Sequence, residues 1–479
     1  MNNSKWLVIN GILWNGLQLI VNQSFSFVVK LILAKILFPE EFGIIGMATV
    51  FTGLVQVVNE LGIGAALVQR KEKDLTDAHY HTAFWSGVLW SVLLFLIVAF
   101  VVAPFASHFY NEPILQSLIP VIAIGILLSP INLVNKAQLT KKMDFKRIAR
   151  AENIATIIAG LIALMLAFYG AGVWSLAFNS TAIVLFAIPF YFNATGWRPK
   201  LVWKKKAFFD VFGFGIYTTG TNITNYFINN VDYLLIGKLI SAHALGVYTL
   251  AFVLTDTFKS RLSSVVNTVM YPIYANMQTD KEAAKKVYIK VVEYNCIVVY
   301  PFMLFLVFLG DPFILEVFGD KWEEALLPLK LLAIAVMVQM LVYSNTVLIR
   351  GMGRPDFELK LQLFKAMIYI PSLIFGIYYN GIIGASWAVL ANRVLAVVIT
   401  NFTFKKLNIS FKINDIFLMT KVPFLASVVT GCVVFLVYDV FKMNSVVSTA
   451  TLIFAYATVI LFYKKTELLH LMEARKRKL

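Results

Sequence analysis

The chain has 479 residues, of which 59% are hydrophobic and only 14% are charged, and its mean hydropathy is +0.77. A soluble domain usually carries about 25% charged residues, so this composition excludes an ordinary soluble globular protein. The net charge of +16 could indicate a nucleic-acid-binding protein, but the cations lie in short stretches between apolar runs, which argues against nucleic acid as a partner. The composition predicts an all-α integral membrane protein.

Cysteine and histidine usage predicts neither a disulfide framework nor a metal site. Cys296 and Cys432 both fall within apolar runs, and the five histidines are scattered along the chain. We therefore expect no cofactor. The first apolar run, residues 6–38, contains two lysines and lacks a small-residue cleavage motif. It is expected to be a retained helix rather than a signal peptide.

Apolar runs long enough to span a bilayer, roughly 20 residues each, recur along the chain. They predict about fourteen transmembrane helices. In chain order the segments are 7–37, 42–69, 80–106, 115–135, 151–169, 173–194, 208–240, 245–272, 287–309, 325–348, 360–379, 382–403, 417–438 and 445–463. We assign six segments to residues 1–203, six to 204–404 and two to 405–479, a region that ends in a basic amphipathic tail.

Basic residues between the segments are concentrated on one side of the membrane. Of the 42 lysines and arginines, 34 lie in loops on the side of the N-terminus, 2 lie in loops on the other side, and 6 lie within segments. Because cytoplasmic loops carry an excess of such residues, both termini are predicted to be cytoplasmic. One inside loop, residues 138–150, mixes apolar residues with cations and predicts a short amphipathic elbow at the headgroups.

The two halves of the chain contain an internal repeat. At an offset of 203 residues the matched pairs are Gln18–Thr221, Asn22–Asn225, Lys35–Lys238 and Gly43–Gly246, and at an offset of 212 they are Lys142–Arg354, Asp144–Asp356 and Gly172–Gly384. Each copy has six segments, and because six is an even number, the second copy starts on the same side of the membrane as the first. The repeat predicts two parallel six-helix lobes with a pathway between them, followed by two added helices.

Polar side chains share one face on two segments related by the repeat. They are spaced i, i+3, i+7 on the first segment and i, i+3, i+7, i+10 on the seventh. The residues are Asn15, Gln18 and Asn22, and then Asn222, Asn225, Asn229 and Asp232. Unsatisfied polar groups are costly in hydrocarbon, so we expect these faces to line a wet cavity, where amides suit sugar hydroxyls. The alternative is that they form hydrogen bonds between helices that hold the bundle together.

Charged residues within the segments are candidates for binding and for ion coupling. Lys30, Lys365 and Arg393 could hold a phosphate or pyrophosphate group by charge-assisted hydrogen bonds. Lys35 and Lys238 lie near the outer ends of their segments. The alternative to a binding role is that their amines extend to the outer membrane–water interface. The candidates for carrying a coupled H⁺ or Na⁺ are Glu60, Asp232 and Asp256.

Two sequence stretches, together with the arrangement of segments, resemble a known family. The stretches are ILAKILFPEEFGIIGMATVF after the first helix and NELGIGAALVQRKE at the end of the second. They are similar to the polysaccharide transporter branch of the multidrug/oligosaccharidyl-lipid/polysaccharide exporter superfamily. The likeness extends over essentially the whole chain and is strongest to flippases of the lipopolysaccharide, colanic acid and teichuronic acid type.

This resemblance implies a mechanism and a set of partners. It implies two lobes that work by alternating access and move undecaprenyl-pyrophosphate-linked repeat units, such as those of O-antigen, across the cytoplasmic (inner) membrane. It implies a lipid-linked oligosaccharide and membrane lipids as partners, with a polysaccharide polymerase and a chain-length regulator as further ones. It also implies a cationic central cavity, for which Lys30, Lys365 and Arg393 are the candidates.

Two other function classes remain open. A cation-coupled small-molecule antiporter of the multidrug branch would also need twelve core helices, although the extra pair and the basic segments argue against it. A membrane polymerase or glycosyltransferase usually has large outer loops with acidic catalytic pairs. Here the pair Glu40 and Glu41 follows Pro39 and is interpreted as the acidic first turn of a helix. The sequence contains no Walker motif, nucleophile elbow or zinc signature, so we expect neither ATP-driven transport by this chain alone nor an enzyme.

Overall fold

The computed structural model describes residues 2–59, 63–70, 75–212, 216–411 and 413–476, and all regular secondary structure in these residues is helical. This confirms the all-α fold class. Ten of the described helical stretches are long and apolar enough to cross a membrane, so the chain is a multi-pass membrane protein. The count of fourteen spans stays a prediction.

By its internal contacts the chain divides into two compact units, residues 1–246 and 247–479. The predicted lobe boundary at residues 203/204 lies earlier in the chain. The difference arises because α10 packs against α2 within the first unit, where the Tyr226 hydroxyl donates to the carbonyl oxygen of Thr49 (2.9 Å). The two six-helix lobes of the repeat therefore stay a prediction from the sequence.

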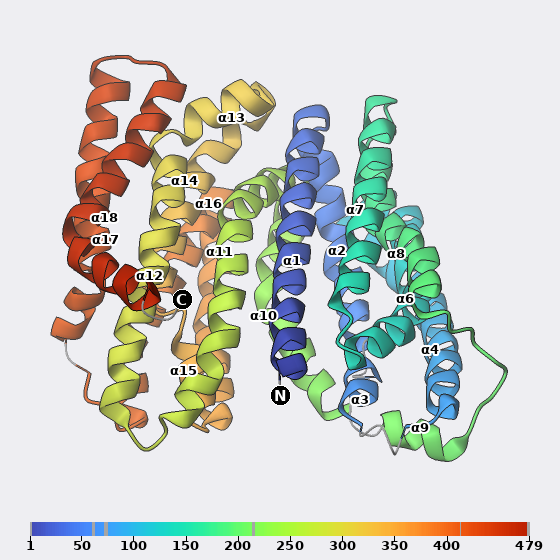
Figure 1. Ribbon diagram of the computed structural model, residues 1–479. Coiled ribbons are helices and arrows are strands. Elements are labelled where there is room, and N and C mark those ends of the chain that lie inside the picture. The colour runs from blue at the N-terminus through green and yellow to red at the C-terminus, as the bar shows by residue number, and fades with distance from the viewer. Residues whose placement is uncertain (1, 60–62, 71–74, 213–215, 412, 477–479) are drawn as a thin grey trace. The chain divides into compact units, whose positions relative to one another are not determined.

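The first unit is built around α6, α7 and α8, with α1 against α7 and α4 against α6 (Figure 1). Its helices are α1 (Asn2–Ile36), α2 (Pro39–Asn59), α3 (Ile63–Gln69), α4 (Asp77–Ile97), η2 (Val98–Val102), α5 (Ala103–Tyr110), α6 (Leu115–Lys141), α7 (Phe145–Phe168), α8 (Val173–Thr195), α9 (Lys205–Phe212) and α10 (Ile216–Leu239). Small residues on α7 allow the close packing: Ala155, Ala159 and Ala163 are all fully buried at four-residue spacing.

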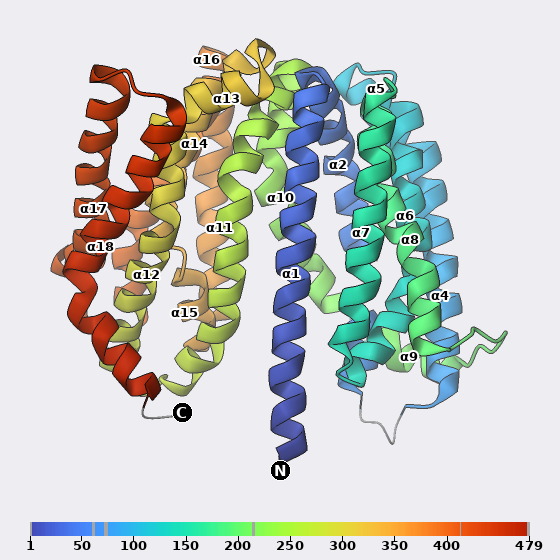
Figure 2. The ribbon, with the colours of Figure 1, turned by 45° about the horizontal axis from the view of Figure 1, so that its top comes forward.

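The second unit begins within α11 and ends with the helix pair α17 and α18, which lies beside α12 (Figure 2). Its helices are α11 (Ala242–Asn276), α12 (Lys281–Phe308), α13 (Gly310–Phe318), η3 (Asp320–Ala325), α14 (Leu326–Met340), α15 (Asn345–Gly351), α16 (Pro355–Lys406), α17 (Ile413–Phe435), η4 (Leu436–Val440) and α18 (Ser445–Lys476). Two largely buried ion pairs attach the final helices to α12. They are Lys285–Asp415 (2.8 Å) and Lys464–Glu293 (3.0 Å).

The long helix α16 contains a sharp break that separates two of the predicted segments. Asn380 and Gly381 have non-helical backbone angles, so the segments 360–379 and 382–403 are the two arms of a helical hairpin. The arms approach closely where a Cβ on Gly384 would lie 1.9 Å from the carbonyl oxygen of Gly376. Only glycine fits at such a distance, which is why the hairpin can close so tightly.

The starts of α2 and α11 form a reciprocal contact at the predicted offset of 203. A Cβ on Gly43 would lie 1.7 Å from the carbonyl oxygen of Ala242, and a Cβ on Gly246 would lie 1.7 Å from the carbonyl oxygen of Pro39. Both the glycines and the two carbonyl residues are separated by 203 positions. The same pair of residues therefore makes the same contact with the partners exchanged, at the start of α2 and at the start of α11.

Two turns also recur, with the same backbone in each half. The bonds Lys142→Gln138, Met143→Thr140 and Asp144→Leu139 reappear as Met352→Leu348, Gly353→Arg350 and Arg354→Ile349, an offset of 210 rather than 212. Gly172 (φ 56°, ψ −132°) and Gly381 (φ 53°, ψ −134°) share one conformation at the next turn. The structural counterpart of Gly172 is thus Gly381 and not Gly384. Small length differences between the copies shift the correspondence.

Several sequence expectations are corrected by the helix boundaries. Lys259 is one of the 34 cations assigned above to inside loops, but it lies within α11, which runs on to Asn276. Residues 138–150 form the end of α6, a tight turn and the start of α7, with Asp144 capping α7 rather than an amphipathic elbow. The stretch between the predicted segments 287–309 and 325–348 is helical (α13 and η3), and the predicted segment 208–240 contains two helices, α9 and α10.

Candidate substrate-binding site

The polar residues predicted on the first segment lie in different environments on α1. Gln18 is buried, and its amide donates a hydrogen bond to the carboxylate of Glu152 on α7. Asn22 is half-buried and Lys30 is exposed, while the side chain of Asn15 lies outside the described ones. Gln18 therefore takes the alternative role considered for these amides, a bond between helices that holds the first unit together.

Glu152 is a functional candidate that sequence reasoning missed. Besides Gln18, it accepts hydrogen bonds from the Lys136 amine (2.6 Å) and the Tyr191 hydroxyl (2.7 Å), so one carboxylate joins α1, α6, α7 and α8. The available signal was a single acid at the start of the apolar run 151–169. We infer a structural role, because all its described partners are donors within one unit.

The polar residues of the seventh segment lie on α10. Asn222 and Asn229 are exposed and Asn225 is half-buried, so part of the predicted face is open to its surroundings. Asp232 is buried, and its carboxylate accepts a hydrogen bond from the backbone N–H of Tyr233 (3.0 Å). Glu60, another of the three proposed ion carriers, lies outside the described residues.

Three cations gather within the second unit. Lys259 of α11 is only 6% exposed, and it forms an ion pair with Asp256 and donates to the Gln339 side-chain oxygen (3.1 Å). Arg393 lines the same hollow as Asp256, Lys259 and Gln339. The charge of Arg393 acts on the amines of both Lys259 and Lys365. The structure thus brings the predicted Lys365 and Arg393 together and adds Lys259 to them.

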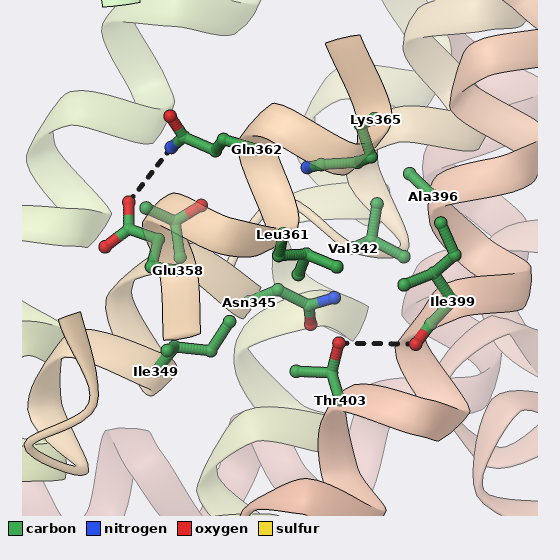
Figure 3. Close-up of a pocket in the computed structure, with 11 residues that line it drawn as sticks. Val342, Asn345, Ile349, Glu358, Leu361, Gln362, Lys365, Ala396, Ile399 and Thr403 are labelled. Atoms are coloured by element: carbon green, nitrogen blue, oxygen red, sulfur yellow. Dashed lines mark hydrogen bonds between the residues drawn. The ribbon is translucent and has the colours of Figure 1, made fainter. Parts of the chain in front are cut away.

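Lys365 lies in a second hollow, between α15 and the two arms of α16 (Figure 3). Asn345 shares this hollow and donates to the hydroxyl of Thr400 (2.9 Å). Glu358 also lines it, but both carboxylate oxygens accept from Arg350 (2.5 and 2.8 Å), so this acid is already neutralised. Lys365 is left as the dominant charge of the hollow.

The depth of these cations follows from their positions along the helices. At 1.5 Å per residue, Lys365 lies about 15 Å from the start of α16, and Arg393 lies about 20 Å from its end. Lys259 lies about 25 Å from the end of α11. Lys365 and Arg393 lie well inside α16, which is long and apolar enough to cross a membrane, and Lys259 lies at the middle of α11. Charges at this depth are expensive and indicate a site for a polar ligand.

The charge balance of the cluster is positive. Asp256 offsets one of the three cations, and neither Lys365 nor Arg393 forms an ion pair with any described carboxylate. Two positive charges therefore remain for a ligand. Sequence reasoning did not name Lys259 as a binding candidate because it counted this residue among the inside-loop cations, although the predicted segment 245–272 contains it. Its spacing of three residues from Asp256, which places both on one helix face, was the available signal.

Comparison with known proteins relates the chain to transport of polysaccharides. It is 24% identical to the lipopolysaccharide biosynthesis protein WzxC of Escherichia coli strain K12, over 88% of this chain and 86% of that protein. It is 26% identical to the teichuronic acid biosynthesis protein TuaB of Bacillus subtilis strain 168, over 80% and 79%. The succinoglycan biosynthesis transport protein ExoT of Rhizobium meliloti strain 1021 is 22% identical over 97% and 95%.

Solved structures share the fold. The lipid II flippase MurJ in an inward closed conformation superimposes with a TM-score of 0.71 at 14% identity, over 95% of this chain and all of that one. An inward-facing multidrug resistance transporter of the MATE family in the MOP superfamily gives 0.59 at 15% identity, over 83% and 98%. The family described as polysaccharide biosynthesis protein matches residues 32–327, which is more than half of the chain. The protein is therefore a member of the polysaccharide biosynthesis protein family, and it shares the fold of the MurJ and MATE structures.

Proposed function

We propose that the protein is a flippase that moves undecaprenyl-pyrophosphate-linked oligosaccharide repeat units across the cytoplasmic membrane for surface polysaccharide synthesis. The observation that carries this proposal is the cation cluster of Lys259, Lys365 and Arg393, deep within a multi-pass membrane protein. A pyrophosphate diester is the anionic group that such a lipid-linked sugar presents. The cluster is its binding site in this proposal.

The chemistry of the cluster suits a pyrophosphate. The diester carries two negative charges, which match the two positive charges left after Asp256 offsets one cation. Arg393 supplies a planar fork of donors that can bind two phosphate oxygens at once, and Lys365 supplies a compact charge. The amides of Gln339 and Asn345 line the same two hollows and can bond sugar hydroxyls.

A cation-coupled multidrug antiporter is the second candidate, and the cluster disfavours it. A positively charged drug would meet two uncompensated positive charges at mid-depth and would be repelled. The fold alone does not separate the two, because both a lipid flippase and a multidrug transporter superimpose on the chain. The relatives' names favour polysaccharide substrates.

The remaining features of the mechanism are proposed from the sequence. The loop charges favour cytoplasmic N- and C-termini. Transport is proposed to proceed by alternating access, coupled to H⁺ or Na⁺ through Glu60, Asp232 or Asp256. Of these three, Asp256 already pairs with Lys259. An H⁺ or Na⁺ that took the place of the Lys259 amine at the Asp256 carboxylate would therefore change the charge of the cluster directly. A polysaccharide polymerase and a chain-length regulator are the proposed protein partners.

The test is transport of a fluorescent undecaprenyl-pyrophosphate sugar by the purified protein in liposomes. Arg393→Gln removes a charged hydrogen-bonding group, which should weaken substrate binding about 10- to 100-fold. The matched control is Arg354→Gln, which removes an exposed arginine from the start of the same helix. Equal transport by both variants, or export of a cationic dye in place of the lipid, would contradict the proposal.

A further inference from the structure

The segment that leads from α8 to α10 is fixed firmly to the first unit. Residues 200–204 run along α4 and make four hydrogen bonds of 2.8 to 3.1 Å to it. The bonds are Trp85 Nε1 to Lys200 O, Lys200 N to His81 Nδ1, Trp203 Nε1 to Ser86 Oγ, and Lys204 N to Thr82 Oγ1. This stretch is held in one position rather than acting as a loose connection.

The following helix, α9, is held by an ion pair. The Asp210 carboxylate lies 3.0 Å from the Arg70 guanidinium and 3.4 Å from the His79 ring. The hydrogen bond from Arg70 and the contact with His79 keep the pKa of Asp210 below its usual value, so the carboxylate stays charged at neutral pH. Figure 1 shows α9 at the same end of the first unit as α3, against which it packs.

What this fixed segment presents to its surroundings is both basic and apolar. Lys200, Lys204, Lys205 and Lys206 are all exposed, and none of them forms an ion pair with a described residue. No acidic residue occurs between positions 196 and 209. Among these lysines, Leu201 is 87% exposed, Trp203 53% and Phe209 62%. The exposure of such large apolar side chains among lysines would be unfavourable if the whole segment faced water.

We propose that residues 200–209 form a binding site for the headgroups of anionic phospholipids. The segment lies at the ends of membrane-spanning helices, where apolar side chains can enter the acyl boundary and lysines can reach phosphates. Tryptophan favours the headgroup level. An acidic protein partner would satisfy the lysines but would give the Leu201 and Phe209 side chains no apolar environment. This inference is independent of the transported substrate.

The test compares binding of phosphatidylglycerol and phosphatidylcholine to the full chain by native mass spectrometry. Each lysine should contribute about fivefold to affinity, so replacing all four by glutamine should weaken phosphatidylglycerol binding by roughly several hundredfold. The control replaces four other exposed lysines, Lys142, Lys360, Lys405 and Lys406, and should retain more of the binding. Phosphatidylcholine binding should be the same in all three proteins.

Three results would overturn the proposal. The first is equal phosphatidylglycerol binding by the test and control variants. The second is competition by millimolar inorganic phosphate, which would indicate a site for free anions rather than for lipid. The third uses only the wild-type chain and so does not depend on folding of a variant. Phosphatidylglycerol binding should fall steeply as salt rises, and salt-independent binding would exclude an electrostatic site.

Discussion

The reciprocal contact between α2 and α11 makes a sharp prediction for Gly43→Ala. The new Cβ would lie 1.7 Å from the carbonyl oxygen of Ala242, whereas real Cβ atoms essentially never come within 3.0 Å of another heavy atom. The two helix starts must therefore separate by more than an ångström. Forcing atoms into a close-packed contact costs about 1–3 kcal/mol, so the thermal midpoint should fall. Gly246→Ala should have the same effect, because its Cβ would meet the carbonyl oxygen of Pro39 at the same distance.

The decisive result is the double variant. Once the helices have separated to admit one methyl group, much of the space for the second is already present. The destabilisation of the double variant should therefore be smaller than the sum of the two single-variant destabilisations. The control is Gly125→Ala on α6, where the nearest atoms lie 3.7 Å away and a helix-interior alanine should be neutral or stabilising. Midpoints should be compared at one heating rate by intrinsic fluorescence. Fully additive penalties, or a Gly43→Ala midpoint equal to that of Gly125→Ala, would refute the reasoning.

Three further predictions follow from the ion pairs. Lys259→Met should destabilise the protein by about 3–5 kcal/mol, because it leaves Asp256 unpaired. Adding Asp256→Leu to this variant should restore the unfolding midpoint but not transport. An unchanged midpoint in Lys259→Met would contradict the pairing. Glu152→Leu should lower the midpoint more than Gln18→Leu, because it leaves three donors without their acceptor, whereas Gln18→Leu removes only one of the three donors to Glu152; the reverse order would be inconsistent with its central position. Since the pKa of Asp210 is lowered, its anchoring of α9 should persist at neutral pH and be lost as the pH falls through that lowered value. Hydrogen exchange in α9, corrected for intrinsic rates, should show this loss, and Asp210→Asn should abolish the pH dependence.

The helices were largely predictable because the bilayer imposes a strong rule on sequence. Each predicted segment coincides with one or more observed helices, since about 20 apolar residues are needed to cross hydrocarbon and polar loops must follow. The repeat offset of 203 was also readable, because glycine is required where Gly43 and Gly246 meet backbone oxygens. The later offset was harder to read. Gly381, and not Gly384, adopts the conformation of Gly172, and sequence letters do not carry backbone angles.

The candidate site was only partly predictable. Lys365 and Arg393 stood out because they interrupt apolar runs, but Lys259 was counted among the inside-loop cations although it lies within α11. Gln18 matched the periodicity of a cavity face, yet its partner, Glu152, is 134 residues away in the sequence, so only the fold reveals the bond. Helical spacing tells which residues share a face. It does not tell what that face contacts.

The central claim is that the cations of the second unit recognise the pyrophosphate of a lipid carrier. The most direct measurement is the affinity of the detergent-solubilised protein for undecaprenyl pyrophosphate, undecaprenyl phosphate and undecaprenol, which share one tail. The wild type should bind them in that order of decreasing affinity, and Lys365→Gln combined with Arg393→Gln should bring the three affinities close together. Equal affinities in the wild type, or an unchanged order in the double variant, would contradict the claim.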